Sequence, residues 1–316
     1  MDLAHPSFTY DELADFRDSI IFCDRFDLTE PASDGYLNGQ LPFVISCGLY
    51  RLLGWKEIVP RLLSVSASLL AIHAIFVISN RLFGFWWAVL TASLLSLSPF
   101  YISSSRLAFS HGHGFPNFLI LWGLYSIGKI TDDTVKPTYL RAGLSSFLLG
   151  LATGSDLLAA FWSLTAFLAL VYWNRKAPKN VQILVALIFL AGTVIGVFVA
   201  SPAYFVDVMQ AKDDITRRLR LWDGLRGYLW LGHRVETIPA YYYLVITLVK
   251  FVPIASLLAL LTIVFFVSEA KNHHPFHRFL FFCFWPVLYF SVKSWKSPYY
   301  LSPYIPIFYL LIVGTL

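Results

Sequence analysis

The chain alternates apolar runs with short polar segments, and this alternation predicts a bundle of membrane-spanning helices. A helix of about 20 apolar residues crosses the hydrocarbon layer of a bilayer. Several runs reach this length, and shorter ones come in pairs separated by a few polar residues. We predict an all-α polytopic membrane protein with about nine spanning helices, at residues 59–80, 84–101, 116–130, 139–153, 157–173, 181–200, 239–267, 278–292 and 299–316.

Two long segments between these runs are polar or amphipathic. Residues 1–58 form an acidic segment in which Asp11 and Glu12 lie side by side in a turn-like stretch. Within it, residues 41–54 are apolar but too short to span, and Arg51 favours a helix lying at the membrane interface. Residues 202–238 are amphipathic. The chain therefore divides into an external segment and interface helix (1–58), a first group of spans (59–200), an external amphipathic loop (202–238) and the last spans (239–316).

Composition supports the membrane assignment. The 316 residues are 57% hydrophobic and 14% charged, whereas soluble domains carry about 25% charged residues. The net charge of +5 requires no nucleic-acid partner, because basic residues beside spans set topology and attract anionic lipid. We expect membrane lipids as partners and no nucleic acid.

The positions of lysine and arginine predict which face each loop occupies. Short loops on one side of the predicted bundle carry Arg81, Lys129, Lys136, Arg141, Arg175, Lys176, Lys179, Lys271 and Arg278. Short basic loops stay in the cytoplasm. The opposite, non-cytoplasmic face then collects residues 1–58, 102–115, 153–156, 202–238 and 293–298, in a prokaryotic plasma membrane or an ER membrane. The basic 202–238 segment conflicts with the rule, which long loops obey poorly.

Every polar group of chemical interest falls on that face. At the mouth of a membrane-embedded cavity, Asp11 and Glu12 are candidates for a catalytic base; the alternative is a solvated loop or a helix N-terminus. Arg106 lies at the end of a predicted span, where a polar side chain either has a functional partner or snorkels. His111 and His113 form a His-Gly-His motif, which is a weak metal signal.

The remaining candidates each have a structural alternative. Asp156 separates two apolar runs, and we favour a helix cap, which still leaves a helix N-terminus able to face an anion. Arg217 and Arg218 belong either to an interfacial helix that binds anionic headgroups or to an arginine clamp for a lipid-linked phosphate. Further polar groups that could line a site, or anchor an aromatic belt at the interface, are His233, Glu236, Lys293, Lys296 and Tyr299.

The three cysteines show no metal-binding spacing. Cys47 and Cys283 lie in apolar runs, where a packed thiol is the expected state.

A series of short motifs follows in a fixed order along nearly the whole chain. The motifs are Asp11-Glu12, Pro42, Arg61-Leu62, Arg81-Leu82-Phe83-Gly84, Ser98-Pro99, Ser105-Arg106-Leu107-Ala108, Gly150-Leu151-Ala152, Pro239 with Tyr241–Tyr243, and Lys296/Tyr299/Pro303/Pro306. In this order they resemble the GT-C glycosyltransferases that use lipid-phosphate sugars. The nearest groups are the protein O-mannosyltransferases and the aminoarabinose transferases of lipid A.

The resemblance implies an inverting transfer of a sugar from a polyprenyl- or dolichyl-phosphate donor to a hydroxyl acceptor on a protein, lipid or glycan. It assigns Asp11 as general base or metal-site ligand. It places Arg106 and Lys296 on the donor phosphate, with Tyr299 beside them and Arg217 and Arg218 as further candidates. It makes no cofactor certain, and Asp11 with His111 is the candidate pair for a divalent metal.

The chain also departs from the family pattern. Family members open with a spanning helix before the acidic loop and often continue beyond the last span, so a missing first helix and C-terminal part are expected here. His111 stands where many have Asp, and Thr153–Asp156 replaces a Lys-Gly. One alternative is therefore a truncated, inactive relative that serves as a membrane scaffold. Another is a lipid or solute transporter, although the chain shows no clear inverted repeat.

Overall fold

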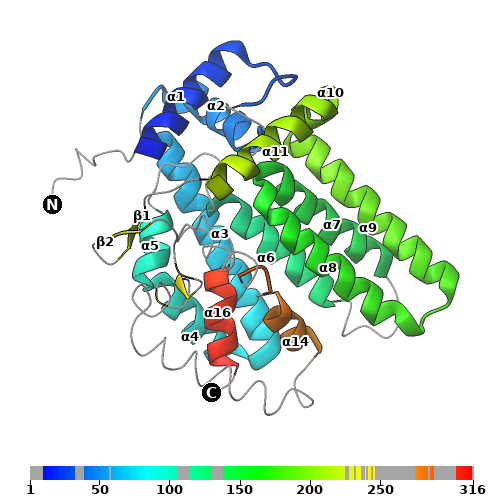
Figure 1. Cartoon of the computed structure of the whole chain (residues 1–316). Coiled ribbons are helices and arrows are strands. Elements are labelled where there is room, and N and C mark those ends of the chain that lie inside the picture. The colour runs from blue at the N-terminus through cyan, green and yellow to red at the C-terminus, as the bar shows by residue number, and fades with distance from the viewer. Residues whose placement is uncertain are drawn as a thin grey trace.

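The described residues form a bundle of packed helices and a small two-stranded hairpin (Figure 1). The computed structural model describes residues 10–32, 39–56, 58–105, 114–129, 138–224, 228–230, 233–235, 239, 241–242, 245, 275–283, 285–287 and 304–314. The helices are α1 (Tyr10–Arg25), α2 (Leu41–Leu53), α3 (Ile58–Phe83), α4 (Phe85–Ser96), α5 (Pro99–Ser105), α6 (Gly114–Gly128), α7 (Thr138–Ser155), α8 (Ala160–Trp173), α9 (Lys179–Ala200), α10 (Ala203–Val206), α11 (Val208–Gly224), α14 (Pro275–Phe282) and α16 (Ile305–Val313). Short 3-10 turns, η2 (Leu157–Ala159) and η3 (Asn174–Lys176), flank α8.

The prediction of a helical membrane fold is confirmed. Among the described residues, three stretches are long and apolar enough to cross a membrane: Ile58–Phe83, Leu157–Lys176 and Lys179–Ala200. They match the spans predicted at 59–80, 157–173 and 181–200. The span predicted at 84–101 is wrong in its extent, because α4 ends at Ser96 and α5 begins at Pro99. Proline lacks the N–H that would continue α4 but fits the first turn of a new helix. Most of the span predicted at 239–267 lies outside the described residues.

Helices α7 and α9 run parallel and touch along a seam of glycines. A Cβ added at Gly150 would lie 3.0 Å from the Cα of Gly196, and one at Gly154 would lie 2.6 Å from the Cβ of Ala200. Such small residues let two backbones approach closely in a membrane. Since α8 connects the two, α7 and α9 run in one direction and α8 runs in the opposite direction through one half of the bundle (Figure 1).

The main core joins this half to the rest of the chain. Buried side chains from α3, α6, α7, α8, α14 and α16 form one apolar cluster. Aromatic contacts bring the C-terminal segments onto α8: the ring centroids of Trp162 and Tyr304 are 4.7 Å apart. The indole Nε1 of Trp285 donates a hydrogen bond to Thr165 Oγ1 at 2.8 Å, which satisfies two polar groups inside the bundle.

The N-terminal polar segment contains a helix, where the sequence predicts a turn-like stretch. Helix α1 packs on α2 through a separate apolar cluster that includes Phe22 and Phe43. A disulfide joins Cys23 to Cys47, with Cα atoms 5.3 Å apart. The expectation of a packed thiol at Cys47 is therefore wrong, because the partner lies 24 residues away in sequence and no spacing rule finds it. Cys283 is a buried free thiol, as expected.

The 202–238 segment, predicted as an external amphipathic loop, contains two helices and a hairpin. It begins with α10 and α11 and then forms an antiparallel pair of short strands, β1 (Tyr228–Trp230) and β2 (His233–Val235). Helix α11 is amphipathic, which suits a helix at an interface. In Figure 1, α10 and α11 lie at the same end of the molecule as α1 and α2.

Candidate functional site

Three segments that are far apart in sequence meet at the α1–α2 end of the bundle, and we call their meeting point the junction. It comprises Gly39 and Gln40 before α2, Ser155 at the end of α7 with Asp156 directly after it, and Ala203 and Tyr204 in α10. The backbone N–H of Gly39 donates to the carbonyl oxygen of Ser155 at 3.0 Å. The sequence predicts these three segments on one face, and the hydrogen bonds place them in contact.

Gln40 is the centre of the junction. Its side chain is 1% exposed. The Nε2 amide donates to the Glu30 carbonyl at 2.7 Å, and Oε1 accepts from the backbone N–H of Ala203 at 3.1 Å. A buried amide with both ends satisfied fixes the geometry of the groups it joins. Gln40 thus ties the first polar segment to the start of α10.

Glycine at position 39 is required by contact with α7. A Cβ added there would overlap the carbonyl oxygen of Gly154 and lie 2.8 Å from the Cα of Ser155. The first polar segment therefore rests directly on the backbone at the end of α7. Any side chain at this position would push the two segments apart.

Asp156 caps the turn that opens α8, as the sequence favours. Its Oδ1 accepts from the backbone N–H of Leu158 at 2.9 Å. It also acts at a distance on Tyr204: burial, and then the charge of Asp156, raise the pKa of the Tyr204 phenol well above its usual value. The phenol stays protonated at physiological pH and remains a hydrogen-bond donor beside a carboxylate.

Asp11 and Glu12 lie in the first turn of α1. Acidic residues at this position are favoured by the helix dipole. Helix α1 is held on α2 by the disulfide and by an edge-on contact between Phe16 and Tyr50, whose ring centroids are 6.2 Å apart. The side chains of Asp11 and Glu12 are outside the described residues, so the structure fixes the helix that carries them and not their partners.

The predicted phosphate ligand Arg217 lies on α11. Its Nη2 atom is 2.6 Å from Asp214 Oδ1, one turn earlier on the same helix, and its side chain is 69% exposed. The backbone of Arg218 continues α11, and that of His233 begins β2, where it pairs with Trp230. These positions agree with a helix and hairpin at one end of the bundle. They do not place either arginine against Asp11.

The other predicted site residues are outside the described residues: Arg106, His111, His113, Glu236, Lys293, Lys296 and Tyr299. Their convergence on one site stays a prediction. Within the described part of the chain, no group of three or more His, Cys, Asp and Glu side chains is placed to hold a metal ion. The candidate pair of Asp11 and His111 is not tested by that observation.

Sequence reasoning missed three polar residues of this end. Gln40 and Tyr204 carry no local motif and are recognisable only once their segments are in contact. Asp18 is the third: it is 8% exposed and accepts two hydrogen bonds from Arg17, at 3.1 and 2.9 Å. It lies seven residues after Asp11 on α1, which is about two helical turns. That spacing is visible in the sequence and is the signal that could have found it.

Comparison with known proteins gives the fold a precedent. No protein-family model and no curated protein sequence matches the chain significantly. Among solved structures, ArnT from Cupriavidus metallidurans bound to undecaprenyl phosphate is similar, with a TM-score of 0.75 and 14% identity over 98% of this chain. The apo state of ArnT matches with a TM-score of 0.69 and 16% identity over 98% of this chain. The chain spans 56% and 55% of the length of those two chains.

The similarity establishes the fold. The chain has a GT-C-like fold and is an integral membrane protein, as the order of its motifs predicts. Identity this low does not transfer an activity. The chemistry must therefore be argued from the residues of this chain.

Proposed function

We propose that this chain is an inverting glycosyltransferase that moves a sugar from a polyprenyl- or dolichyl-phosphate donor to a hydroxyl acceptor on the non-cytoplasmic face. The observation that carries the proposal is the match of 98% of the chain to ArnT, a protein whose structure was solved with undecaprenyl phosphate bound. The order of motifs along the sequence supports the same family independently of the three-dimensional comparison.

Two features support a non-cytoplasmic position for the junction end. The Cys23–Cys47 disulfide lies there, and disulfides persist in oxidising compartments. At the opposite end, Arg81 Nη2 donates to the Gly128 carbonyl and Arg141 Nη1 donates to the Lys129 carbonyl, each at 2.9 Å. Basic residues gathered at one end of a bundle favour the cytoplasm for that end.

In the proposed reaction, the acceptor oxygen attacks the anomeric carbon while the bond from that carbon to the phosphate oxygen breaks. Asp11 takes the proton of the acceptor hydroxyl, because an unassisted hydroxyl is a weak nucleophile. Glu12 lies beside it. The lipid phosphate leaves with the bonding electron pair. Its charge is balanced by Arg106 and Lys296, with Tyr299, Arg217 and Arg218 as further ligands.

The other polar residues predicted on this face line the site in this proposal: His111, His113, Asp156, His233, Glu236 and Lys293. The junction holds in place three of the segments that carry or adjoin these residues. It fixes the segment between α1 and α2 against α7 and α10, and through α10 it leads into α11. If Asp11 and His111 hold a divalent metal, the metal contributes positive charge at the same place. Strong chelation abolishes transfer only in that case.

The test is transfer of radiolabel from a polyprenyl-phosphate sugar in membranes that contain the protein. Asp11→Asn keeps the size of the side chain and removes the base, so we expect loss of transfer by about 100-fold or more with normal insertion. Asp24→Asn changes an exposed carboxyl on the same helix and is the matched control, with activity retained. Full activity in Asp11→Asn would remove the assigned base, and no transfer by the unmodified chain from any polyprenyl-phosphate sugar would favour the scaffold alternative.

A further inference from the structure

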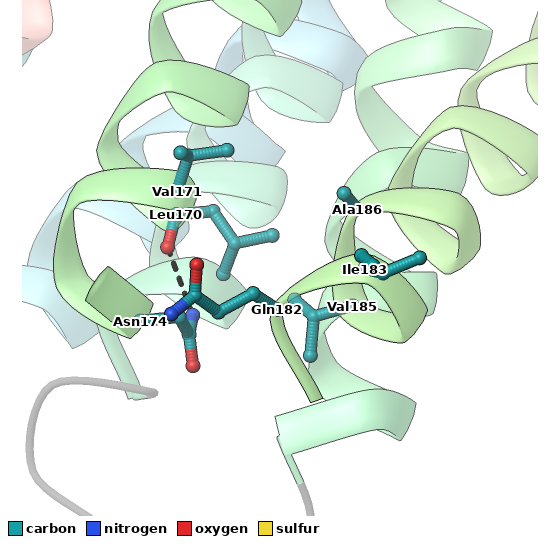
Figure 2. A pocket seen from close by; sticks show the side chains of 7 residues that line it. All are labelled: Leu170, Val171, Asn174, Gln182, Ile183, Val185 and Ala186. Atoms are coloured by element: carbon teal, nitrogen blue, oxygen red, sulfur yellow. Dashed lines mark hydrogen bonds between the residues drawn. The ribbon is translucent and has the colours of Figure 1, made fainter. Parts of the chain in front are cut away.

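A shallow apolar groove lies between α8 and α9, at the end of the bundle opposite the junction. It is lined by Leu170, Val171, Asn174, Gln182, Ile183, Val185 and Ala186 and encloses about 210 Å³ (Figure 2). Small-molecule sites occupy roughly 300–1,000 Å³. The groove therefore suits a segment of an apolar chain better than a compact ligand.

The end of the groove is polar and well ordered by its own hydrogen bonds. Asn174 Nδ2 donates to the Leu170 carbonyl at 2.8 Å, and Gln182 Nε2 donates to the Ala177 carbonyl at 2.7 Å. Figure 2 shows these two amides together where the α8–α9 connection closes the groove. They fix the connection, which carries the charged residues, in place beside the apolar lining.

Among the described residues, the charged side chains near the groove are basic. Residues 138–206 include four basic side chains, Arg141, Arg175, Lys176 and Lys179, and one acidic side chain, Asp156, which lies in the junction at the other end. Arg175 stacks on Tyr172 with its guanidinium carbon 4.1 Å from the ring centroid, while Lys176 and Lys179 are exposed. The groove therefore opens beside the exposed basic side chains of Arg175, Lys176 and Lys179.

The groove also faces the surface that a bilayer would cover. Ile183 and Val171, on its two walls, are 60% and 46% exposed, and the neighbouring side chains along α9 are exposed and apolar. An apolar cleft that ends at a basic patch is complementary to a lipid with an acyl chain and an anionic headgroup.

We infer that the α8–α9 groove binds one anionic phospholipid, with an acyl chain along Val171, Ile183 and Ala186 and its phosphate against Arg175, Lys176 and Lys179. This site is separate from the proposed donor site, because it lies at the other end of α8 and α9. It does not depend on the chain being a glycosyltransferase.

The experiment measures lipid binding to the purified, detergent-solubilised protein by native mass spectrometry, with dioleoyl phosphatidylglycerol and dioleoyl phosphatidylcholine as probes. We expect one phosphatidylglycerol to bind about tenfold more tightly than phosphatidylcholine, because each basic residue near the headgroup adds attraction. The triple variant Arg175→Gln, Lys176→Gln, Lys179→Gln should bind the two lipids equally.

Two further variants separate the groove from charge alone. The triple variant Arg25→Gln, Lys56→Gln, Lys212→Gln removes the same charge from exposed sites elsewhere and should keep the preference. Ala186→Trp fills the groove and should weaken the binding of both lipids. The melting temperature in lipid-free detergent should stay near that of the unmodified protein. Equal binding of both lipids by the unmodified protein, or the same loss in the two triple variants, would overturn the inference. Inorganic phosphate at millimolar concentration should not displace the lipid; displacement would assign the patch to free phosphate.

Discussion

At the scale of single residues, Gln40 contributes more to the stability of the fold than its sequence context indicates. One buried amide satisfies a carbonyl ten residues earlier and an N–H 163 residues later. A polar group buried without a partner costs about 1–3 kcal/mol. The side chain therefore stabilises the contact between these two segments.

Replacement of Gln40 by alanine should lower the free energy of unfolding by about 1–3 kcal/mol, because the N–H of Ala203 and the carbonyl of Glu30 lose their partner. Thermal unfolding in detergent measures the change. Gln210→Ala, at an exposed position on α11, should change the free energy of unfolding by no more than about 0.5 kcal/mol. Equal effects of the two substitutions would show that the amide is not a structural link.

At the scale of elements, α1 is held on α2 by a covalent bond and a small apolar cluster. The cluster is separate from the main core. A helix with so little apolar contact depends on its tether, since short isolated helices are marginal in water. The disulfide is therefore what keeps the helix that carries Asp11 and Glu12 in place.

The double variant Cys23→Ser, Cys47→Ser should be less stable by about 3 kcal/mol, the value expected for a closed loop of this size. Proteolysis of the first 58 residues should accelerate, and dithiothreitol should have the same effect on the unmodified protein. Cys283→Ala keeps the disulfide and should retain the sensitivity to dithiothreitol. A double variant as resistant to protease as the parent would mean that the apolar cluster alone suffices.

The parallel pair α7 and α9 depends on the absence of side chains. Gly150→Ala should destabilise the protein by about 1–3 kcal/mol, because the new methyl overpacks against the backbone of α9. Gly48→Ala places the same methyl on α2, where nothing lies within 4 Å, and should stabilise by about 0.5–1 kcal/mol. Thermal unfolding of the two variants therefore should shift in opposite directions. Shifts of the same sign would contradict the glycine seam.

At the scale of the whole molecule, the sequence predicts the class of fold well. The length of each apolar run and the order of the motifs can both be read directly along the chain. The apolar runs at 59–80 and 181–200 form helices long and apolar enough to span a membrane, and the GT-C resemblance is confirmed as a fold. The sequence offers a helix N-terminus at Asp11 and Glu12 only as an alternative to a solvated loop, because a short acidic stretch suits both, and the structure has the helix. The Cys23–Cys47 pair and the contact of Gln40 with Ala203 escaped prediction because they join segments whose proximity only the assembled bundle creates.

The candidate site is less predictable for a related reason. Asp156 is assigned correctly as a cap, since capping is decided within three residues. Arg217 has a partner on its own helix, Asp214, and no sequence rule distinguishes that pair from a phosphate ligand. A site built from several loops is defined by distances between them, and spacing along the chain does not contain those distances.

The distribution of charge predicts the orientation of the whole protein. In a Cys283→Ala background that keeps the native disulfide, Lys212→Cys should react with a membrane-impermeant maleimide in intact cells. Lys176→Cys should react only after permeabilisation, because short basic loops favour the cytoplasm for that end. Both positions are exposed, so accessibility within the protein is matched. The reverse labelling pattern would invert the proposed topology and place the junction in the cytoplasm.

The Cys23–Cys47 bond also has a consequence for biogenesis. Its two sulfurs can join only if the loop that contains them has reached a compartment with an oxidising thiol poise. A copy inserted upside down would carry both as free thiols. The oxidation state of this pair can be read by the gel shift of an alkylating tag. It would therefore report the orientation in which each molecule was inserted into the membrane.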